Sequence, residues 1–168
     1  MLPNFSTVSQ NIATTTRTYL AGSMVTILSP GLQIGSKIRW TFDMTKTLAG
    51  LAASTIDIAF GTTGTVTDLA RVSFAKNAGT AVVDEGNFII ECLIRGPLSA
   101  SGVAVGFMTL KHNLATTGMT STGNNTVVTV SSAFDVTFAN CTRVGLCLTT
   151  GLNDNVTIQS VKTETWSI

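Results

Sequence analysis

The segment from residue 36 to residue 60 constrains the fold of this chain more than any other part of the sequence. Its first run alternates polar side chains with four apolar ones, which are Ile38, Trp40, Phe42 and Met44. A second alternating run has its apolar side chains at Ile56, Ile58 and Phe60. Because successive side chains of a strand point to opposite faces, each run predicts a strand with one buried and one solvated face. Two such strands joined by a loop predict an antiparallel sheet that needs a second layer to cover it.

Short strand candidates separated by turn residues continue along the chain. In chain order they cover residues 19–28, 37–45, 54–60, 71–75, 87–95, 103–111, 126–131, 143–150 and 155–165, with a further candidate at 134–138. One helical turn is expected over Val66–Ala70, capped by Thr65. Eight to nine short strands with almost no helix predict an all-β fold, an antiparallel two-sheet sandwich that is jelly-roll-like. We expect residues 19–168 to form this single β-sandwich domain, preceded by an N-terminal arm over residues 1–18.

The chain carries few charges for its size. Its 168 residues are 44% hydrophobic and 11% charged, against roughly 25% charged in an average soluble protein. A surface with so few charges protects a free monomer poorly from association, so we expect other subunits to cover much of it. The formal net charge of +1 gives no electrostatic footprint for direct nucleic-acid binding. No apolar run reaches the roughly 18 residues of a membrane span.

Two parts of the chain are candidates for contacts between subunits. Residues 1–18 are mostly polar and could not order by themselves, so they form either a loose tail or, as we favour, an arm on a neighbouring subunit. The strand over residues 87–95 is apolar on one face and half-apolar on the other, as in a central strand or one at a subunit contact. The candidate contact residues are Phe5, Val8, Ile12 and Arg17 in the arm, Ile89 and Leu93 in this strand, and Trp166 and Ile168 after the last strand.

No catalytic motif stands out in the sequence. The chain contains no G-x-S-x-G string, which a nucleophile elbow requires, and its single histidine does not by itself specify a catalytic relay. We expect this residue, His112, to be a polar strand-end residue that bonds a loop. Trp40 lies on the inward face of its strand, which leaves Trp166 as the aromatic side chain to consider as an exposed contact.

Metal-ligating residues are too sparse to predict a site, and we expect no cofactor. The three cysteines, Cys92, Cys141 and Cys147, include no C-x-x-C pair. Cys92 falls on the apolar face of a strand and is expected in the core. A bridge between the other two is an open alternative that the absence of a secretion signal disfavours. The acidic segments 84–86 and 153–155 lack the ligand spacing of a calcium loop and are interpreted as turns.

Several segments together resemble a module of tailed-bacteriophage virion proteins. They are Gly35-Ser36-Lys37-Ile38-Arg39-Trp40, Met44-Thr45-Lys46-Thr47-Leu48-Ala49-Gly50, Arg71-Val72-Ser73-Phe74, Gly86 to Arg95, Lys111 to Gly118 and Gly145-Leu146. The similarity covers approximately residues 19–165, and its most specific part is the Arg-Trp pair followed by Met-Thr-Lys-Thr-x-Ala-Gly. In that family the module is a β-sandwich or jelly roll of head-decoration, head-fibre and tail-fibre proteins, which usually assemble as trimers and carry no catalytic motif.

The resemblance implies a non-enzymatic structural protein of the virion, made in the host cytoplasm. The chain has a short arm and the module but no shaft or coiled-coil sequence, which favours a small protein on the capsid surface over a long fibre. We therefore expect a capsid cement or decoration protein that acts as a homotrimer, binds the outside of the major capsid protein shell and stabilises it. The alternative is a head- or tail-fibre module that binds a host receptor glycan.

Overall fold

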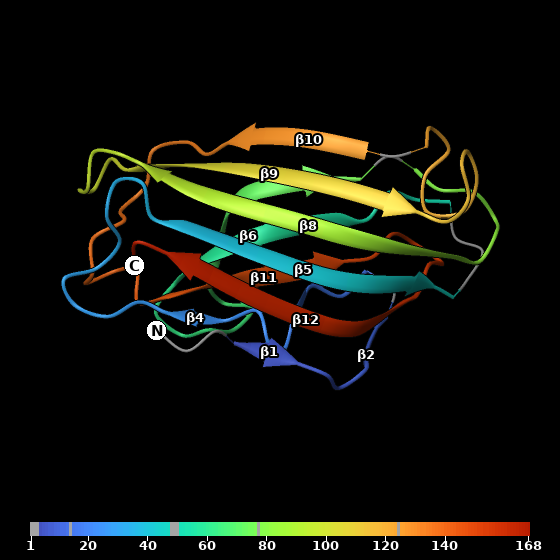
Figure 1. Cartoon of the computed structure of the whole chain (residues 1–168), viewed down its shortest axis with the longest axis horizontal. Coiled ribbons are helices and arrows are strands. Elements are labelled where there is room, and N and C mark those ends of the chain that lie inside the picture. The colour runs from blue at the N-terminus through green and yellow to red at the C-terminus, as the bar shows by residue number, and fades with distance from the viewer. Residues whose placement is uncertain (1–3, 14, 48–50, 77, 124) are drawn as a thin grey trace.

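The computed structural model describes residues 4–13, 15–47, 51–76, 78–123 and 125–168, and its regular structure is entirely β. Its twelve strands lie in two layers (Figure 1). The expected all-β, antiparallel two-sheet sandwich is confirmed. It has more strands than the eight to nine of the sequence prediction because four of them are only two or three residues long. None of the described residues forms a helix that could cross a membrane.

The larger layer has seven strands and the smaller one has five. Along the larger sheet the order is β1 (Phe5–Ser6), β12 (Val156–Trp166), β5 (Lys37–Lys46), β8 (Asp84–Arg95), β9 (Val103–His112) and β10 (Asn125–Val130), with β2 (Gln10–Ile12) also paired to β12. The smaller sheet runs β3 (Thr18–Tyr19), β11 (Arg143–Thr149), β6 (Thr55–Gly61) and β7 (Leu69–Ala75), with β4 (Val25–Thr26) also paired to β11. These strand pairs are all antiparallel.

Strands from the first part of the sandwich pair with strands from its last part in nested order. β5 pairs with β12, β6 with β11, and β8 with β9. The chain crosses between the two sheets after β2, β4, β5, β7, β10 and β11 (Figure 1). This folded-back pairing is jelly-roll-like, as the sequence predicts. It brings loops that are far apart in the sequence to the same end of the sandwich.

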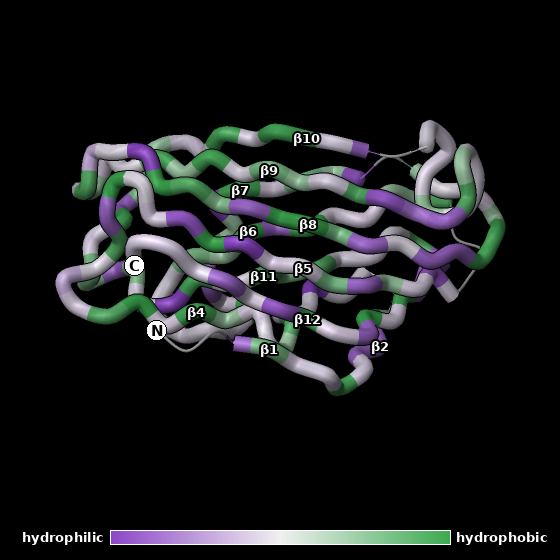
Figure 2. Tube along the Cα trace, in the orientation of Figure 1, coloured by the Kyte–Doolittle hydropathy of each residue, from purple (hydrophilic) through white to green (hydrophobic). Residues whose placement is uncertain are grey.

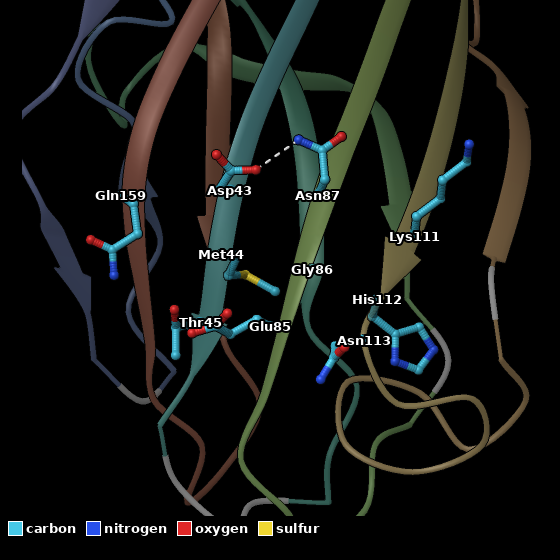
Figure 3. Close-up of a pocket in the computed structure, with 10 residues that line it drawn as sticks. All are labelled: Asp43, Met44, Thr45, Glu85, Gly86, Asn87, Lys111, His112, Asn113 and Gln159. Carbon is cyan, nitrogen blue, oxygen red and sulfur yellow. Dashed lines mark hydrogen bonds between the residues drawn. The ribbon is translucent and has the colours of Figure 1, made fainter.

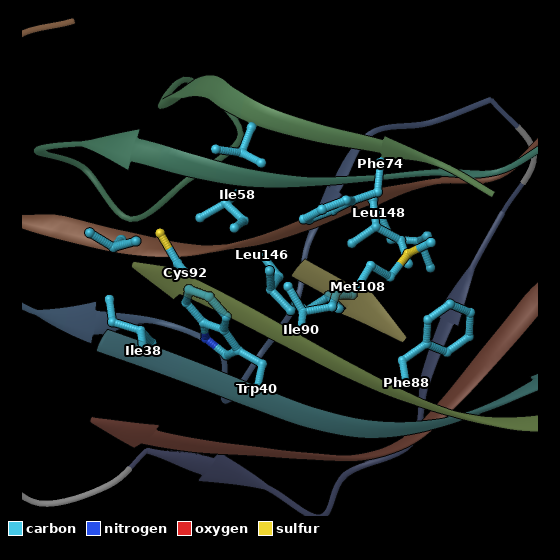
Figure 4. Packing of buried hydrophobic residues seen from close by; sticks show 14 of the residues in the cluster. Ile38, Trp40, Ile58, Phe74, Phe88, Ile90, Cys92, Met108, Leu146 and Leu148 are labelled. Carbon is cyan, nitrogen blue, oxygen red and sulfur yellow. The ribbon is translucent and has the colours of Figure 1, made fainter. Parts of the chain in front are cut away.

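The core lies between the two layers and is built by the alternating runs (Figure 4). The four apolar side chains of β5, from Ile38 to Met44, are each at most 2% exposed, as the alternation predicts. Among them, Trp40 donates a hydrogen bond from its indole Nε1 to the carbonyl oxygen of Ser23 at 2.7 Å. The hydroxyl of Ser23 in turn accepts from the backbone N–H of Leu146 at 3.0 Å. The indole of the larger sheet is thereby linked to β11 of the smaller one.

The described part of the N-terminal arm adds strands to the larger sheet of its own chain. β1 pairs Phe5 with Lys162, and β2 pairs Ile12 with Val156, both on β12. β12 would otherwise present a row of unpaired backbone groups, so pairing with β12 satisfies these groups and orders this part of the polar arm. Ile12 reaches the core at 1% exposure, whereas Val8 is 70% exposed. Contact of this arm with a neighbouring subunit stays a prediction.

Replacement of the buried Ile12 by alanine is expected to lower the free energy of unfolding by about 2–4 kcal/mol, because the substitution leaves a cavity in the core. Val8→Ala, in the same arm but exposed, is expected to stay within about 0.5 kcal/mol of the wild type. Urea denaturation followed by circular dichroism measures both variants. Equal stability of the two would contradict the packing of the arm on its own chain.

The helical turn expected over Val66–Ala70 is absent, and that expectation is wrong. β7 already begins at Leu69. The carboxylate of Asp68 accepts hydrogen bonds from the backbone N–H groups of Thr63 and Gly64 at 3.1 and 2.7 Å. These side-chain bonds satisfy the backbone locally and close an irregular loop in place of a helix.

Two strand expectations are also corrected. The strand expected over residues 19–28 is divided into β3 and β4. Gly22 lies between them with φ of +84°, a left-handed conformation that favours glycine, and a Cβ there would lie 2.4 Å from the backbone nitrogen of Ser6. The strand expected over residues 134–138 is reduced to a single bridge at Phe134.

Candidate functional site

The outward side chains of the seven-stranded sheet form two contrasting areas. Because side chains alternate along a strand and paired residues lie opposite each other, the members of one register row share a face. Over β8, β9 and β10 the outward residues are mostly apolar. Where β12, β5, β8 and β9 approach the opposite end of the sheet, they are polar. The change in hydropathy along these strands can be followed in Figure 2.

We call the first area the apolar patch. Its residues are Ile89 and Leu93 of β8, Val105 and Phe107 of β9, and Val128 and Val130 of β10. One register row joins Leu93, Val105 and Val130, and the next places Phe107 opposite Val128. Phe107, Val128 and Val130 are 38%, 58% and 54% exposed in the single chain. Contiguous exposed apolar side chains of this kind mark interaction surfaces.

The apolar patch reaches an edge of the sheet. β10 is the last strand in the sheet order, and within the described part of the chain its ladder is formed on one side only, with β9. The six residues of β10, Asn125 to Val130, include no charged residue and no proline. Charged residues and proline are what usually protects an edge strand against pairing with another chain. An unprotected edge beside an apolar patch favours the addition of a partner.

Charged and aromatic side chains border the patch on the side of β5. The carboxylate of Glu91 pairs with the Lys37 ammonium at 2.9 Å and with the Arg39 guanidinium at 3.7 Å. The same ammonium lies 5.6 Å from the ring centroid of Trp166, within reach of a cation–π contact. Trp166, Lys37 and Leu93 stand in one register row, so the indole shares the outer face with the patch.

The eight candidate contact residues divide between this outer face and other places. Four of them share the outer face of the larger sheet, and these are Phe5, Ile89, Leu93 and Trp166. The other four lie elsewhere: Val8 is exposed between β1 and β2, Ile12 is in the core, Ile168 packs against the core, and Arg17 forms an ion pair with Asp57 at 2.6 Å. The apolar patch therefore contains two of the expected residues, and it extends beyond them to β9 and β10.

The second area is a groove of about 560 Å³ that we call the polar groove (Figure 3). Its lining residues are Asp43, Met44 and Thr45 of β5, Glu85, Gly86 and Asn87 of β8, Lys111 and His112 of β9, Asn113 after β9, and Gln159 of β12. One register row joins Asp43, Asn87 and Lys111, and the next pairs Thr45 with Glu85. The groove thus crosses four strands that meet only in the folded sheet.

Two features arrange the side chains of the polar groove. Asn87 donates a hydrogen bond from Nδ2 to the Asp43 carboxylate at 2.8 Å, which couples the outward side chains of β5 and β8 (Figure 3). Gln159 lies where the register of β12 with β5 shifts, between Ile158 and Ser160. A bulge places one extra residue in a strand and redirects its side chain. Here it adds an exposed amide to the border of the groove.

A buried carboxylate fixes the strand ends beside the groove. Asp84 Oδ2 lies 2.7 Å from His112 Nδ1 with both side chains fully buried, and it accepts from the Met119 N–H at 2.9 Å. Asp84 Oδ1 accepts from the Glu85 N–H at 2.8 Å. Burial by itself raises the pKa of Asp84, but these hydrogen bonds outweigh it and hold the pKa below its ordinary value. His112, which also lies 3.3 Å from the Thr120 hydroxyl, is confirmed as a strand-end residue that bonds a loop.

A second buried ionic group lies next to this carboxylate. Lys46, the register partner of Asp84, has its Nζ 3.7 Å from Asp154 Oδ1, and both of these side chains are 2% exposed. Lys76 donates to the carbonyl oxygen of Met119. Burial lowers the pKa of Lys76 to about 8, and burial raises the pKa of Asp154. The first contact joins the end of β5 to the segment just before β12, and the second joins the end of β7 to the loop after β9.

The cysteines take no part in either area of the outer face. All three are free and buried, and Cys92 lies in the core as expected. Burial raises the pKa of the Cys141 and Cys147 thiols to about 12, which keeps them neutral and unreactive. In the described ranges, no group of three or more His, Cys, Asp or Glu side chains is placed to hold a metal ion.

The polar groove was not among the sites expected from the sequence. In the sequence, each of its central residues is a polar position in or beside a separate strand candidate; these residues are Asp43, Asn87 and Lys111. No short segment around any of them indicates that the three lie side by side in the fold. The three residues could have been predicted to be neighbours only by combining their outward orientation with the pairing register of the strands. That register is fixed by the whole sheet and not by any one segment.

Comparisons with known proteins add a broad structural likeness. No protein-family model and no curated protein matches the sequence. The chain is similar to a mutant of alginate lyase Aly36B in complex with alginate trisaccharide, with TM-score 0.44, 6% identity, and 94% of this chain and 81% of that one covered. It is similar to a lectin from Bauhinia forficata in complex with GalNAc, with TM-score 0.36, 12% identity and coverage of 98% and 93%. Similarity at this level concerns the strand arrangement and says nothing of function.

Proposed function

We propose that this chain is a structural virion protein, a capsid cement or decoration subunit that assembles as a homotrimer and binds the outside of the major capsid protein shell. The observation that carries the proposal is the apolar patch beside the unprotected edge strand β10. The resemblance of residues 19–165 to tailed-phage virion modules supplies the setting, and the low charge of the chain supports a surface covered by partners.

The patch is suited to a second copy of the chain. It combines β-branched and aromatic side chains with bordering charges of both signs, Lys37, Arg39 and Glu91, which a symmetric partner could match. Complete burial of one such apolar side chain contributes about 1.5–3 kcal/mol, and roughly half of that remains to be gained at positions that are about half exposed. Three copies around one axis would cover the patch of each subunit and the β10 edge beside it.

The mechanism needs no chemistry beyond non-covalent binding, and we propose no enzymatic activity. A trimer seated on a capsid adds buried interface between neighbouring shell proteins. This interface resists outward pressure from packaged DNA because shell expansion must first separate it. The exposed side chains of Phe5 and Val8 lie at the far edge of the larger sheet from β10, where they can contact the shell while the patch holds the trimer.

Val128→Asp is expected to convert the trimer into monomers, because it places a charge in the centre of a buried interface. Light scattering coupled to gel filtration should give about three times the 17.5-kDa chain mass for the wild type and the chain mass for the variant. Ser73→Asp is the matched control, since Ser73 is exposed on β7 of the other sheet, and it should leave the trimer intact.

The same three proteins then test whether the chain binds the capsid. Fluorescently labelled wild type and Ser73→Asp should decorate heads of particles that lack the protein, and Val128→Asp should bind them much more weakly. A wild-type protein that is monomeric at micromolar concentration would overturn the homotrimer. Labelling of tails instead of heads would overturn the cement role and favour the receptor-binding alternative.

A further inference from the structure

We propose that the polar groove is a binding site for a neutral oligosaccharide. This inference concerns a single chain and its groove of about 560 Å³, so it stands apart from the proposal that copies of the chain assemble. Its basis is a set of polar side chains from four strands that the sheet register and the β12 bulge bring together on one face (Figure 3).

The dimensions of the groove suit a sugar unit. Neighbouring strands lie about 4.8 Å apart, so the row from Asp43 through Asn87 to Lys111 spans roughly 10 Å. The next outward row, Thr45 and Glu85, lies roughly 7 Å farther along the strands. Ligand hydroxyl groups held above the sheet would therefore meet polar side chains in both directions.

The lining chemistry alternates donors and acceptors as a polyhydroxylated ligand requires. Sugar hydroxyls both donate and accept hydrogen bonds, so they need both kinds of partner within one site. The carboxylates of Asp43 and Glu85 accept, the Lys111 ammonium donates, and the amides of Asn87 and Gln159 do both. The Asn87 amide donates from Nδ2 to the Asp43 carboxylate at 2.8 Å and to the Phe42 carbonyl oxygen at 3.5 Å, so its side-chain oxygen is the atom that would accept from a ligand hydroxyl.

Other ligand classes fit the groove less well. Two carboxylates against one ammonium disfavour phosphate esters and acidic sugars. A metal ion is disfavoured because the described residues offer no group of three suitable ligands. An apolar ligand is disfavoured because no Phe, Tyr or Trp is among the described residues that line the groove. A neutral saccharide fits this lining better than any of these classes.

The backbone on two sides of the groove is held in place by a buried carboxylate. Glu85 follows the buried Asp84, whose carboxylate holds the Glu85 N–H, and Lys111 precedes His112, which lies 2.7 Å from the same carboxylate. The start of β8 and the end of β9, which border the groove, are therefore ordered before a ligand binds, and this lowers the entropy lost on binding. Because none of the described residues that line the groove is aromatic, we expect a dissociation constant on the order of 1 mM for one groove.

A glycan array printed with neutral and acidic oligosaccharides is the first test, and ¹⁵N-edited NMR titration with the best neutral hit is the second. The wild type should bind neutral glycans, and the largest shifts should fall on the backbone amides of Asn87, Lys111 and Gln159. Asn87→Ala and Asp43→Ala should each weaken binding by about tenfold or more. Thr126→Ala, an exposed outward position on β10 of the same sheet, is the matched control and should bind like the wild type.

Asp43 and Asn87 lie on the solvent side of the sheet, so their substitution should leave the fold intact. Thermal melting of both variants checks that they are folded. Three results would overturn the inference. They are an array without any neutral hit, binding restricted to acidic glycans, and binding that neither groove substitution weakens. The Val128→Asp protein should keep the single-groove affinity while losing any gain from multivalent display, which separates this site from the assembly surface.

Discussion

Asp84→Ala is expected to lower the free energy of unfolding by about 3–5 kcal/mol, because it removes a buried carboxylate that several interior donors share. The carboxylate accepts from the backbone N–H groups of Glu85, Met119 and Leu114, at 2.8, 2.9 and 3.3 Å, and contacts the buried ring of His112. Each donor left without a partner in the interior adds about 1–3 kcal/mol. Urea denaturation at neutral pH measures the loss.

The matched control for this prediction is Glu85→Ala, one residue further along β8 and exposed. It should change the stability by no more than about 0.5 kcal/mol. A loss below about 1 kcal/mol for Asp84→Ala would show that the buried contact does not stabilise the strand end.

The same carboxylate gives a pH dependence with a defined sign. The pKa of Asp84 is lower in the folded chain than its ordinary value of 3.8. A carboxyl group with a lowered folded pKa stabilises the fold above the unfolded pKa, and this stability is lost as the pH falls through the folded pKa. Acidification below about pH 4 should therefore destabilise the wild type, and the Asp84→Asn variant should lose less stability over the same range.

Trp40→Ala is the second large effect, with an expected loss of about 3–5 kcal/mol. The indole is fully buried and links the two sheets through Ser23, whose hydroxyl accepts from the backbone of Leu146. Trp40→Phe removes the Nε1 hydrogen bond and leaves a smaller cavity than alanine does, so it should cost less than Trp40→Ala. Chemical denaturation followed by circular dichroism ranks the two variants.

The other tryptophan provides the control for this pair. Trp166 is 45% exposed, and Trp166→Ala should stay within about 1 kcal/mol of the wild type. Equal losses for Trp40→Ala and Trp166→Ala would contradict the assignment of Trp40 to the core.

Local patterns predicted the elements whose structure depends on local rules. The run from Ile38 to Met44 alternates over the length of a strand, and each of its apolar side chains is buried as that period requires. The alternation of Ile56, Ile58 and Phe60 also placed these side chains in the core, as it did Cys92. The solvated face expected for this second run is wrong, because Asp57 and Ala59 between them are also buried. The two runs also lie in different sheets and not side by side in one. A period of two residues is a property of the strand backbone, so a short segment is enough to reveal it.

Features that depend on pairing between distant segments were missed or misread. The segment 84–86 looked like a turn, but it is the start of β8, because Asp84 satisfies its carboxylate with His112 and Met119 further along the chain. Ile12 looked like part of an outward arm, but β2 pairs with β12, which lies at the other end of the sequence. The polar groove follows the same rule, since its register rows join residues from separate strands.

The position of β12 has a consequence for how the chain is made. This strand lies inside the larger sheet, with β1 and β2 on one side and β5 on the other. A ribosome releases residues 5–12 and 37–46 long before residues 156–166, so both flanking segments wait with bare edges during translation. Closure of the sheet is therefore a late step, and chains that still lack β12 expose strand edges of the kind that promotes aggregation.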